Sequence, residues 1–102
     1  LVKSSAASDV YKRQNVNFLA KSQLNLSNKF AGSLEKRWVN TKYKIANNKV
    51  PFFPESLGLL EAKVEKKVIS GDHTIIICLI TNCIKLNTKK PLIYYKSKYH
   101  TV

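Results

Sequence analysis

The chain of 102 residues has few of the residues that build redox or metal motifs: three glycines, two cysteines and no methionine. Cys78 and Cys83 are separated by a spacing that fits neither a CxxC motif nor a zinc pattern. We expect both to be small apolar strand residues in a reducing compartment, and predict a cytoplasmic location. No run of about 18 uninterrupted apolar residues occurs, so we expect no membrane span.

Common catalytic motifs are also missing. The sequence contains no G-x-S-x-G motif, no glycine-rich phosphate loop and no H-E-x-x-H motif. His73 and His100 lack the cysteine or carboxylate neighbours of a convincing metal site. We therefore expect neither hydrolysis nor zinc chemistry, and no metal.

Acidic residues are scarce: the sequence has 18 Lys and Arg but only 6 Asp and Glu, which gives a net charge of +12. Arg13 and Arg37 are the only arginines, so nearly all of the cations are lysines. Arginine is the residue suited to bidentate contacts with bases and phosphates, so we favour a solvated lysine surface over a specific nucleic-acid partner. The charge remains compatible with loose polyanion binding and with attracting phosphorylated cofactors.

The first residues, "LVKSSAASDVYKRQ", lack the apolar segment and cleavage signal of a signal peptide. They resemble translated cloning or sequencing adapter, and the first residue is Leu in a chain without Met. We predict that residues 1–14 are a non-native leader and that the natural reading frame begins near Asn15.

The next segment predicts a short strand end followed by a helix. "VNFL" is apolar-rich, and we place the helix at about 23–30, with Ser22 as its N-cap and Gly32 as its C-terminal stop. Farther on, Pro51 and Pro54 exclude a regular helix or central strand around "FF". We expect Phe52 and Phe53 on an extended loop, with at least one ring in the core.

From residue 57 onward the pattern predicts antiparallel β-structure. Alternation predicts a half-buried strand with two unlike faces. Leu60, Ala62, Val64 and Val68 lie on its buried face, and Glu61, Lys63, Glu65 and Lys67 on its solvent face. Gly71 and Asp72 form a turn. The run 74–84 is apolar on both sides and predicts a central strand, and a further strand is expected to start at Pro91.

Several short pieces suit a planar cofactor: Phe30-Ala31-Gly32, Gly71-Asp72-His73, and Tyr94, Tyr95 and Tyr99. Their order resembles the flavin reductase-like family. "VNFLAKSQLNLSNKFAG" is similar to the family's "VNVL" strand and helix ending in "FA", and "LEA" stands where "LEC" is frequent. "GDHTI" matches the Gly-Asp-His signature, and "PLIYYKSKY" is similar to the closing "PLLYY-x-x-x-Y".

This resemblance implies a mainly β fold with a short helix: a partial, antiparallel FMN-binding split β-barrel. The resemblance covers 15–102. We find no counterpart of the family's N-terminal strands or of its Ser/Thr-rich phosphate segment, so we interpret the chain as the C-terminal part of the domain. It implies FMN or FAD as cofactor, NADH or NADPH as hydride donor, and reduced flavin supplied to a monooxygenase. It also implies a homodimer whose partner subunit completes the flavin site.

Site residues follow from the same resemblance. As catalytic residues we predict His73, donating a hydrogen bond to the flavin or the nicotinamide amide, and Asp72, orienting it or capping the turn. As cofactor-binding residues we predict Phe30, Ala31, Gly32, Lys21, Ser22 and Tyr99. The resemblance further implies that Gly32 and His73 share one cleft around the flavin ring.

Plainer readings stand beside these roles. Without the resemblance, His73 is a turn residue, Phe30 anchors a helix to the core, and the tyrosines are ordinary strand content. Ser22 is more simply an N-cap than an anion ligand. Tyr94 and Tyr95 are expected in the core and at an interface.

Two alternative functions remain open. One is a small basic β-barrel that binds single-stranded nucleic acid through Lys and aromatic platforms, although "YYKSKYH" alternates them only locally. The other is a flavin-binding relative without reductase turnover. Under the fragment interpretation, unpaired strand edges and an apolar face are left open, and we expect the isolated chain to bind flavin poorly and to be inactive.

Overall fold

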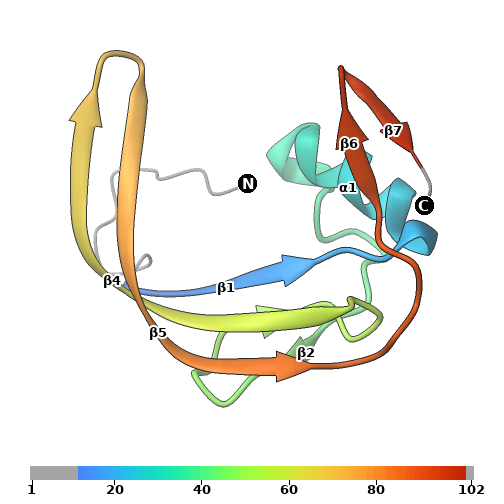
Figure 1. Cartoon of the computed structure of the whole chain (residues 1–102), viewed down its shortest axis with the longest axis horizontal. Helices are drawn as coiled ribbons and strands as arrows, with labels where there is room; N and C mark the ends of the chain where they lie inside the picture. Colours follow the sequence, from blue (N-terminus) through green and yellow to red (C-terminus); the bar gives the residue numbers. More distant parts are fainter. Residues whose placement is uncertain (1–11, 101–102) are drawn as a thin grey trace.

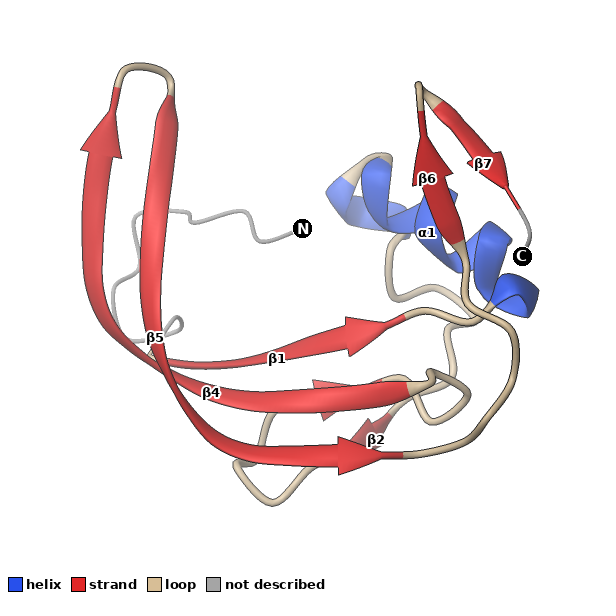
Figure 2. Cartoon of the chain, in the orientation of Figure 1, coloured by secondary structure: helices blue, strands red, loops and turns tan. Residues whose placement is uncertain are grey.

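The computed structural model describes residues 12–100. Figures 1 and 2 show a curved sheet beside one short helix, which confirms the expected mainly β class. The elements are β1 (Arg13–Phe18), η2 (Lys21–Gln23), α1 (Leu24–Ala31), η3 (Leu34–Lys36), β2 (Lys44–Ile45), β3 (Pro51–Phe52), β4 (Gly58–Ser70), β5 (His73–Lys85), β6 (Ile93–Tyr95) and β7 (Lys98–His100).

The main sheet is antiparallel, with strand order β1-β4-β5. The central strand is therefore β4, and the prediction that the run 74–84 is central is wrong. In β5, which is an edge strand among the described residues, Ile75 is 51% and Leu79 is 52% exposed. A run that is apolar on both faces indicates a strand with both faces buried, but it does not specify which segments pack on those faces.

The β4–β5 hairpin forms a long arm that rises from the sheet on the side away from α1 (Figure 1). Its turn consists of Gly71 and Asp72 between the paired residues Ser70 and His73. Gly71 has a φ of 60°, a conformation that glycine adopts at little steric cost. The predicted turn is thus confirmed, and it makes His73 the first residue of β5.

Glu61 corrects the predicted two-faced pattern of β4, because it is 1% exposed instead of facing solvent. The register shifts between Glu61 and Ala62 and again between Val64 and Lys66, which breaks the simple alternation. The backbone N–H of Asn48 and Nδ2 of Asn82 each donate to one Glu61 carboxylate oxygen, both at 2.8 Å. These two donors allow the carboxylate to be buried.

Asparagine side chains of β1 tie the loop around β3 to the sheet. Asn15 Nδ2 donates to the carbonyl oxygens of Val50 and Pro51, at 3.0 and 3.2 Å. Asn17 Oδ1 accepts from the Phe53 backbone N–H at 3.0 Å. These bonds place the Phe53 ring against Phe30, so the predicted docking of a ring from this loop is confirmed.

Helix α1 begins one residue later than predicted, and Ser22 is not its N-cap. The Ser22 side chain makes no capping bond; instead, Gln23 Oε1 accepts from the Ala20 backbone N–H at 2.8 Å. At the other end Gly32 follows the last helical residue as predicted, and its N–H donates to the Lys29 carbonyl. Its φ of −88° is one that other residues adopt as well.

The C-terminal residues form a small hairpin, β6–β7, beside α1 (Figure 1). Pro91 is bridged to Ala20, so the predicted strand is shorter than expected and begins at Ile93. Tyr94 and Tyr95 are 65% and 61% exposed, so their predicted place in a core is wrong. A short edge hairpin leaves one side of these rings without cover.

The described core is small. Its buried apolar residues are Ala20, Ala46, Leu59 and Ala62. The sheet is not closed, and several apolar side chains of the arm, such as Ile69 and Ile75, are exposed. The predicted leader 1–14 stays a prediction: residues 1–11 lie outside the described residues, and β1 starts at Arg13.

Candidate functional site

The predicted catalytic residues lie at the tip of the β4–β5 arm. His73 and Asp72 side chains are 84% and 93% exposed, and His73 Nε2 lies 3.5 Å from Asp72 Oδ1. At that exposure the pair is a weak orienting contact, because water screens the interaction. The imidazole is therefore accessible to another molecule or another chain.

The predicted flavin-contacting residues Phe30, Ala31 and Gly32 lie at the end of α1. The Phe30 ring packs edge-on against Trp38 and Phe53, with centroid distances of 5.2 and 5.0 Å. The Gly32 N–H caps the helix, and its carbonyl accepts from Arg37 Nη2 at 3.1 Å. Phe30 is thus held rigidly, whereas the polar groups of Gly32 are already bonded.

Tyr99 belongs to this helical side of the molecule. Its hydroxyl lies 2.9 Å from Ser27 Oγ in the middle of α1, and its ring contacts the Tyr94 ring at 5.1 Å. The hydrogen bond joins β7 to α1 across a long stretch of sequence. The structure therefore brings Tyr99 to the same helix as Phe30 and Ala31.

Lys21 and Ser22 lie in η2, immediately before α1. The Lys21 backbone N–H donates to the Lys90 carbonyl at 2.8 Å, and its side chain is exposed. Ser22 is exposed and lines a surface pocket. Both side chains remain available to an anion.

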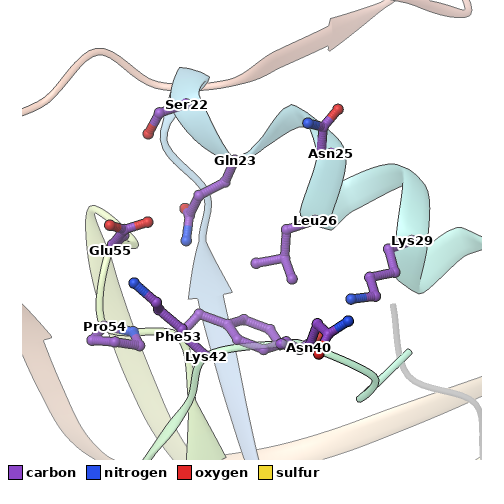
Figure 3. Close-up of a pocket in the computed structure, with 11 residues that line it drawn as sticks. Ser22, Gln23, Asn25, Leu26, Lys29, Asn40, Lys42, Phe53, Pro54 and Glu55 are labelled. Atoms are coloured by element: carbon purple, nitrogen blue, oxygen red, sulfur yellow. The ribbon is translucent and has the colours of Figure 1, made fainter. Parts of the chain in front are cut away.

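The pocket has a volume of about 330 Å³ and lies between η2 with the first turns of α1, loop 40–42 and loop 53–55. Figure 3 shows side chains from these three segments pointing into one space. Phe53 contributes to its wall, and through Phe53 the pocket adjoins Phe30. Sequence reasoning missed Gln23, Lys29 and Lys42 here, because their approach depends on tertiary packing.

Gln23 had a readable signal. In a capping box, a Gln or Glu at the third helical position uses its side chain to bond the backbone N–H of the residue that precedes the helix. Here Gln23 is 5% exposed, accepts from Ala20, and its Nε2 donates to Ser56 Oγ at 3.3 Å. Its fixed side chain forms the pocket wall nearest η2.

The expected shared cleft is not formed within one described chain. In Figure 1 the arm tip, where β5 begins with His73, lies at the upper left and is well apart from α1. His73 does not line the pocket beside α1. The structure thus brings together Phe30, Ala31, Gly32 and Tyr99 around α1, and separates His73 from them.

Within residues 12–100, no group of three or more His, Cys, Asp or Glu side chains is placed to hold a metal ion. In the same range, no helix combines the length and apolar character needed to cross a membrane.

A model of the flavin reductase-like domain matches residues 3–102. The chain belongs to this family. Its fold matches solved flavin reductases: one in complex with NADP+ (26% identity, TM-score 0.79) and one in its native state (32% identity, TM-score 0.79). The styrene monooxygenase flavin reductase from Pseudomonas putida shares the fold as well, at 24% identity and TM-score 0.82.

These matches cover 94%, 92% and 99% of the chain, in that order, but only 64%, 60% and 67% of the matched proteins. The chain thus spans about two thirds or less of these flavin reductases. The open sheet is the corresponding part of their fold, which confirms the expected partial split β-barrel.

Proposed function

We propose that the chain is the C-terminal part, from about Asn15, of an NAD(P)H-dependent flavin reductase. The intact protein binds FMN or FAD and transfers hydride from the nicotinamide to the flavin. One observation carries this proposal: the family match runs over residues 3–102 and includes the Gly-Asp-His and closing tyrosine motifs. A related flavin reductase solved with NADP+ supports a nicotinamide nucleotide as donor.

The reaction places modest demands on the protein. A bound flavin would supply the hydride acceptor, and the chain has to hold the nicotinamide carbon near the acceptor atom and keep water out. Phe30, packed between Trp38 and Phe53, offers a rigid apolar wall. Ala31 leaves room beside it for a flat ring, and the His73 imidazole is exposed and can reach a ligand.

We propose that the active form is a homodimer in which the arm of one chain carries His73 to the α1 end of its partner. Two features support this arrangement. Within one chain His73 and Gly32 lie apart, and the arm exposes apolar side chains, with Ile69 at 81% and Ile77 at 47%. Apolar surface of this kind is typical of protein interfaces.

The isolated chain is expected to bind flavin poorly and to be inactive. The Gly32 N–H and carbonyl are already bonded within the chain, so they are not free to bind a flavin. Lys21 and Ser22 remain as candidate anion ligands. Tight stoichiometric binding of FMN or FAD to the 102-residue chain would contradict this expectation.

Reduced flavin is a diffusible product, and we propose that it is passed to a monooxygenase in the cytoplasm. A matched structure is a styrene monooxygenase flavin reductase.

The test is a hydride-transfer assay with the chain extended by its in-frame upstream coding sequence. We expect flavin-dependent oxidation of NADH or NADPH, and a primary isotope effect with nicotinamide deuterated at the transferred position. His73→Ala should lower the rate about tenfold or more, since positioning groups contribute on this scale. Absence of turnover with both nicotinamides and both flavins would overturn the proposal.

A second candidate function has one observation in its favour. The β6–β7 hairpin exposes Tyr94 and Tyr95, and Lys96 Nζ lies 5.5 Å from the Tyr95 ring centroid. Stacking platforms beside cations suit single-stranded nucleic acid. Salt-sensitive binding of an oligonucleotide, lost in Tyr95→Ala and unaccompanied by flavin reduction, would favour this function.

A further inference from the structure

We infer that the pocket between α1, loop 40–42 and loop 53–55 is a second ligand site, for a small planar organic anion. This inference does not depend on the flavin proposal, because it rests on the pocket's own residues. At about 330 Å³ the pocket is within the size range of small-molecule sites. Its walls come from three segments that the fold holds together.

The apolar part of the pocket is rigid. Phe53 and Leu26 line it, and the Phe53 ring is held edge-on by Phe30 at 5.0 Å. The Phe53 backbone is fixed by its N–H bond to Asn17 Oδ1. A rigid aromatic wall of this kind suits a flat ring, which can stack on it or meet its edge.

The polar part of the pocket has unused donors. Between Lys12 and His100, the structure records no hydrogen bond or ion pair for the side chains of Asn25, Asn40 and Lys42, although each of them lines the pocket. Lys29 also lines it, and its amine donates to the Val39 carbonyl. Free amide and ammonium donors around an apolar wall suit a carboxylate or phosphate group.

Charge points to the same ligand. Lys29 and Lys42 are opposed only by Glu55 among the pocket residues, so the site carries one net positive charge. In Figure 3 the Lys42 amine extends toward the part of the pocket where Glu55 lies. Glu55 provides an acceptor for a hydroxyl or N–H on the ligand, while Lys42 favours its anionic group.

The pocket differs from the predicted flavin site in composition. It contains neither His73 nor Tyr99, and none of Phe30, Ala31 and Gly32 lines it. Ser22 is the one predicted cofactor-binding residue that lines it. Competition with FMN therefore decides whether the two sites are separate.

The test is a titration of the full chain with para-hydroxybenzoate, which combines a flat ring, a carboxylate and a hydroxyl. Backbone amide shifts by NMR locate the site, and fluorescence of Trp38 gives an independent reading, since its ring lies 5.8 Å from the Phe53 ring. We expect saturable shifts confined to the three pocket segments. Shifts that do not saturate, or that map elsewhere, would overturn the inference.

Variants separate this site from general attraction to a basic surface. Lys42→Gln removes the charge of an exposed side chain and should weaken binding about fivefold or more. Lys85→Gln, an exposed lysine of β5 outside the pocket, is the matched control and should leave binding unchanged. Equal weakening by both variants would reduce the effect to net charge and overturn the site.

Three further ligands complete the test. Neutral para-hydroxybenzamide should bind about tenfold more weakly if the ionic contact matters. Inorganic phosphate alone should produce only part of the shifts; if it reproduces all of them, the planar wall plays no role. If FMN displaces para-hydroxybenzoate from the pocket, the pocket belongs to the flavin site and the second-site inference is wrong.

Discussion

The helical side of the molecule and the β4–β5 arm satisfy their side chains in opposite ways. Around α1, rings meet rings, as Phe30 meets Trp38 and Phe53, and polar groups such as Gln23 find partners within the chain. On the arm, apolar side chains such as Ile69 remain largely exposed. The first region is held together by contacts within the chain, whereas the second exposes apolar surface.

This contrast explains why family membership and a functional site are separate questions here. The fold elements that carry the family's motifs are present, yet the motif on the arm and the motif on the helix do not meet in one chain. Apolar arms of this length expose surface that folding alone does not bury. This separation is the reason for proposing that the arm of one chain meets the helix end of another.

The largest expected effect is on the free energy of unfolding, at the central strand β4. Leu59→Ala should lower the free energy of unfolding by about 2–5 kcal/mol, because Leu59 is 1% exposed on β4 and its loss leaves a cavity. Ile77→Ala on the arm is the control and should cost less than about 1 kcal/mol. Chemical denaturation of both variants measures this, and equal costs would break the comparison.

Glu61→Gln is expected to cost about 2–3 kcal/mol, because an amide presents N–H to a donor where the carboxylate accepted from Asn48 and Asn82. Glu65→Gln, in the same strand but exposed, serves as control. The measurement is again denaturant unfolding. A neutral result for Glu61→Gln would mean that its two bonds are not made in solution.

On the arm, charge should abolish association rather than folding. Ile77→Lys, at a side chain 47% exposed, should weaken self-association about tenfold or more, since a buried lysine at an interface is poorly tolerated. Analytical ultracentrifugation measures the effect. Thr88→Lys, at an exposed loop position outside the arm, is the control. Equal loss in both variants would remove the specificity of the apolar face.

The smallest effect concerns the link between α1 and β7. Tyr99→Phe and Ser27→Ala should each cost about 0.5–1.5 kcal/mol, and the double variant no more than either alone, because they share one hydrogen bond. Denaturant unfolding of the two single variants and the double variant measures their coupling. Additive costs would show that the two hydroxyls do not interact.

Sequence reasoning succeeded where the determinant is local. Gly71 turns the chain because glycine accepts a positive φ, and Gly32 follows the last residue of α1. The prolines around Phe53 limited that segment to an extended form. Each of these features depends on residues close in sequence.

It failed where the determinant is distant. Glu61 is buried because Asn48 and Asn82 approach it from other segments and the register shifts beside it. The strand β5 lies at an edge because no other described strand pairs with it. The separation of His73 from α1 follows from the length and direction of the arm, which alternation of residue types does not encode.

The most direct test of the central claim uses mixed dimers of the extended protein. Ala31→Leu, at an exposed helix end, places a larger side chain where the flavin ring is proposed to lie. His73→Ala removes the imidazole of the arm. Each variant alone should have at most about a tenth of the flavin reduction rate. Dissociating the two variants and reassociating them together should restore part of the activity. No recovery in verified mixed dimers would contradict a site built from the helix end of one chain and the arm of another.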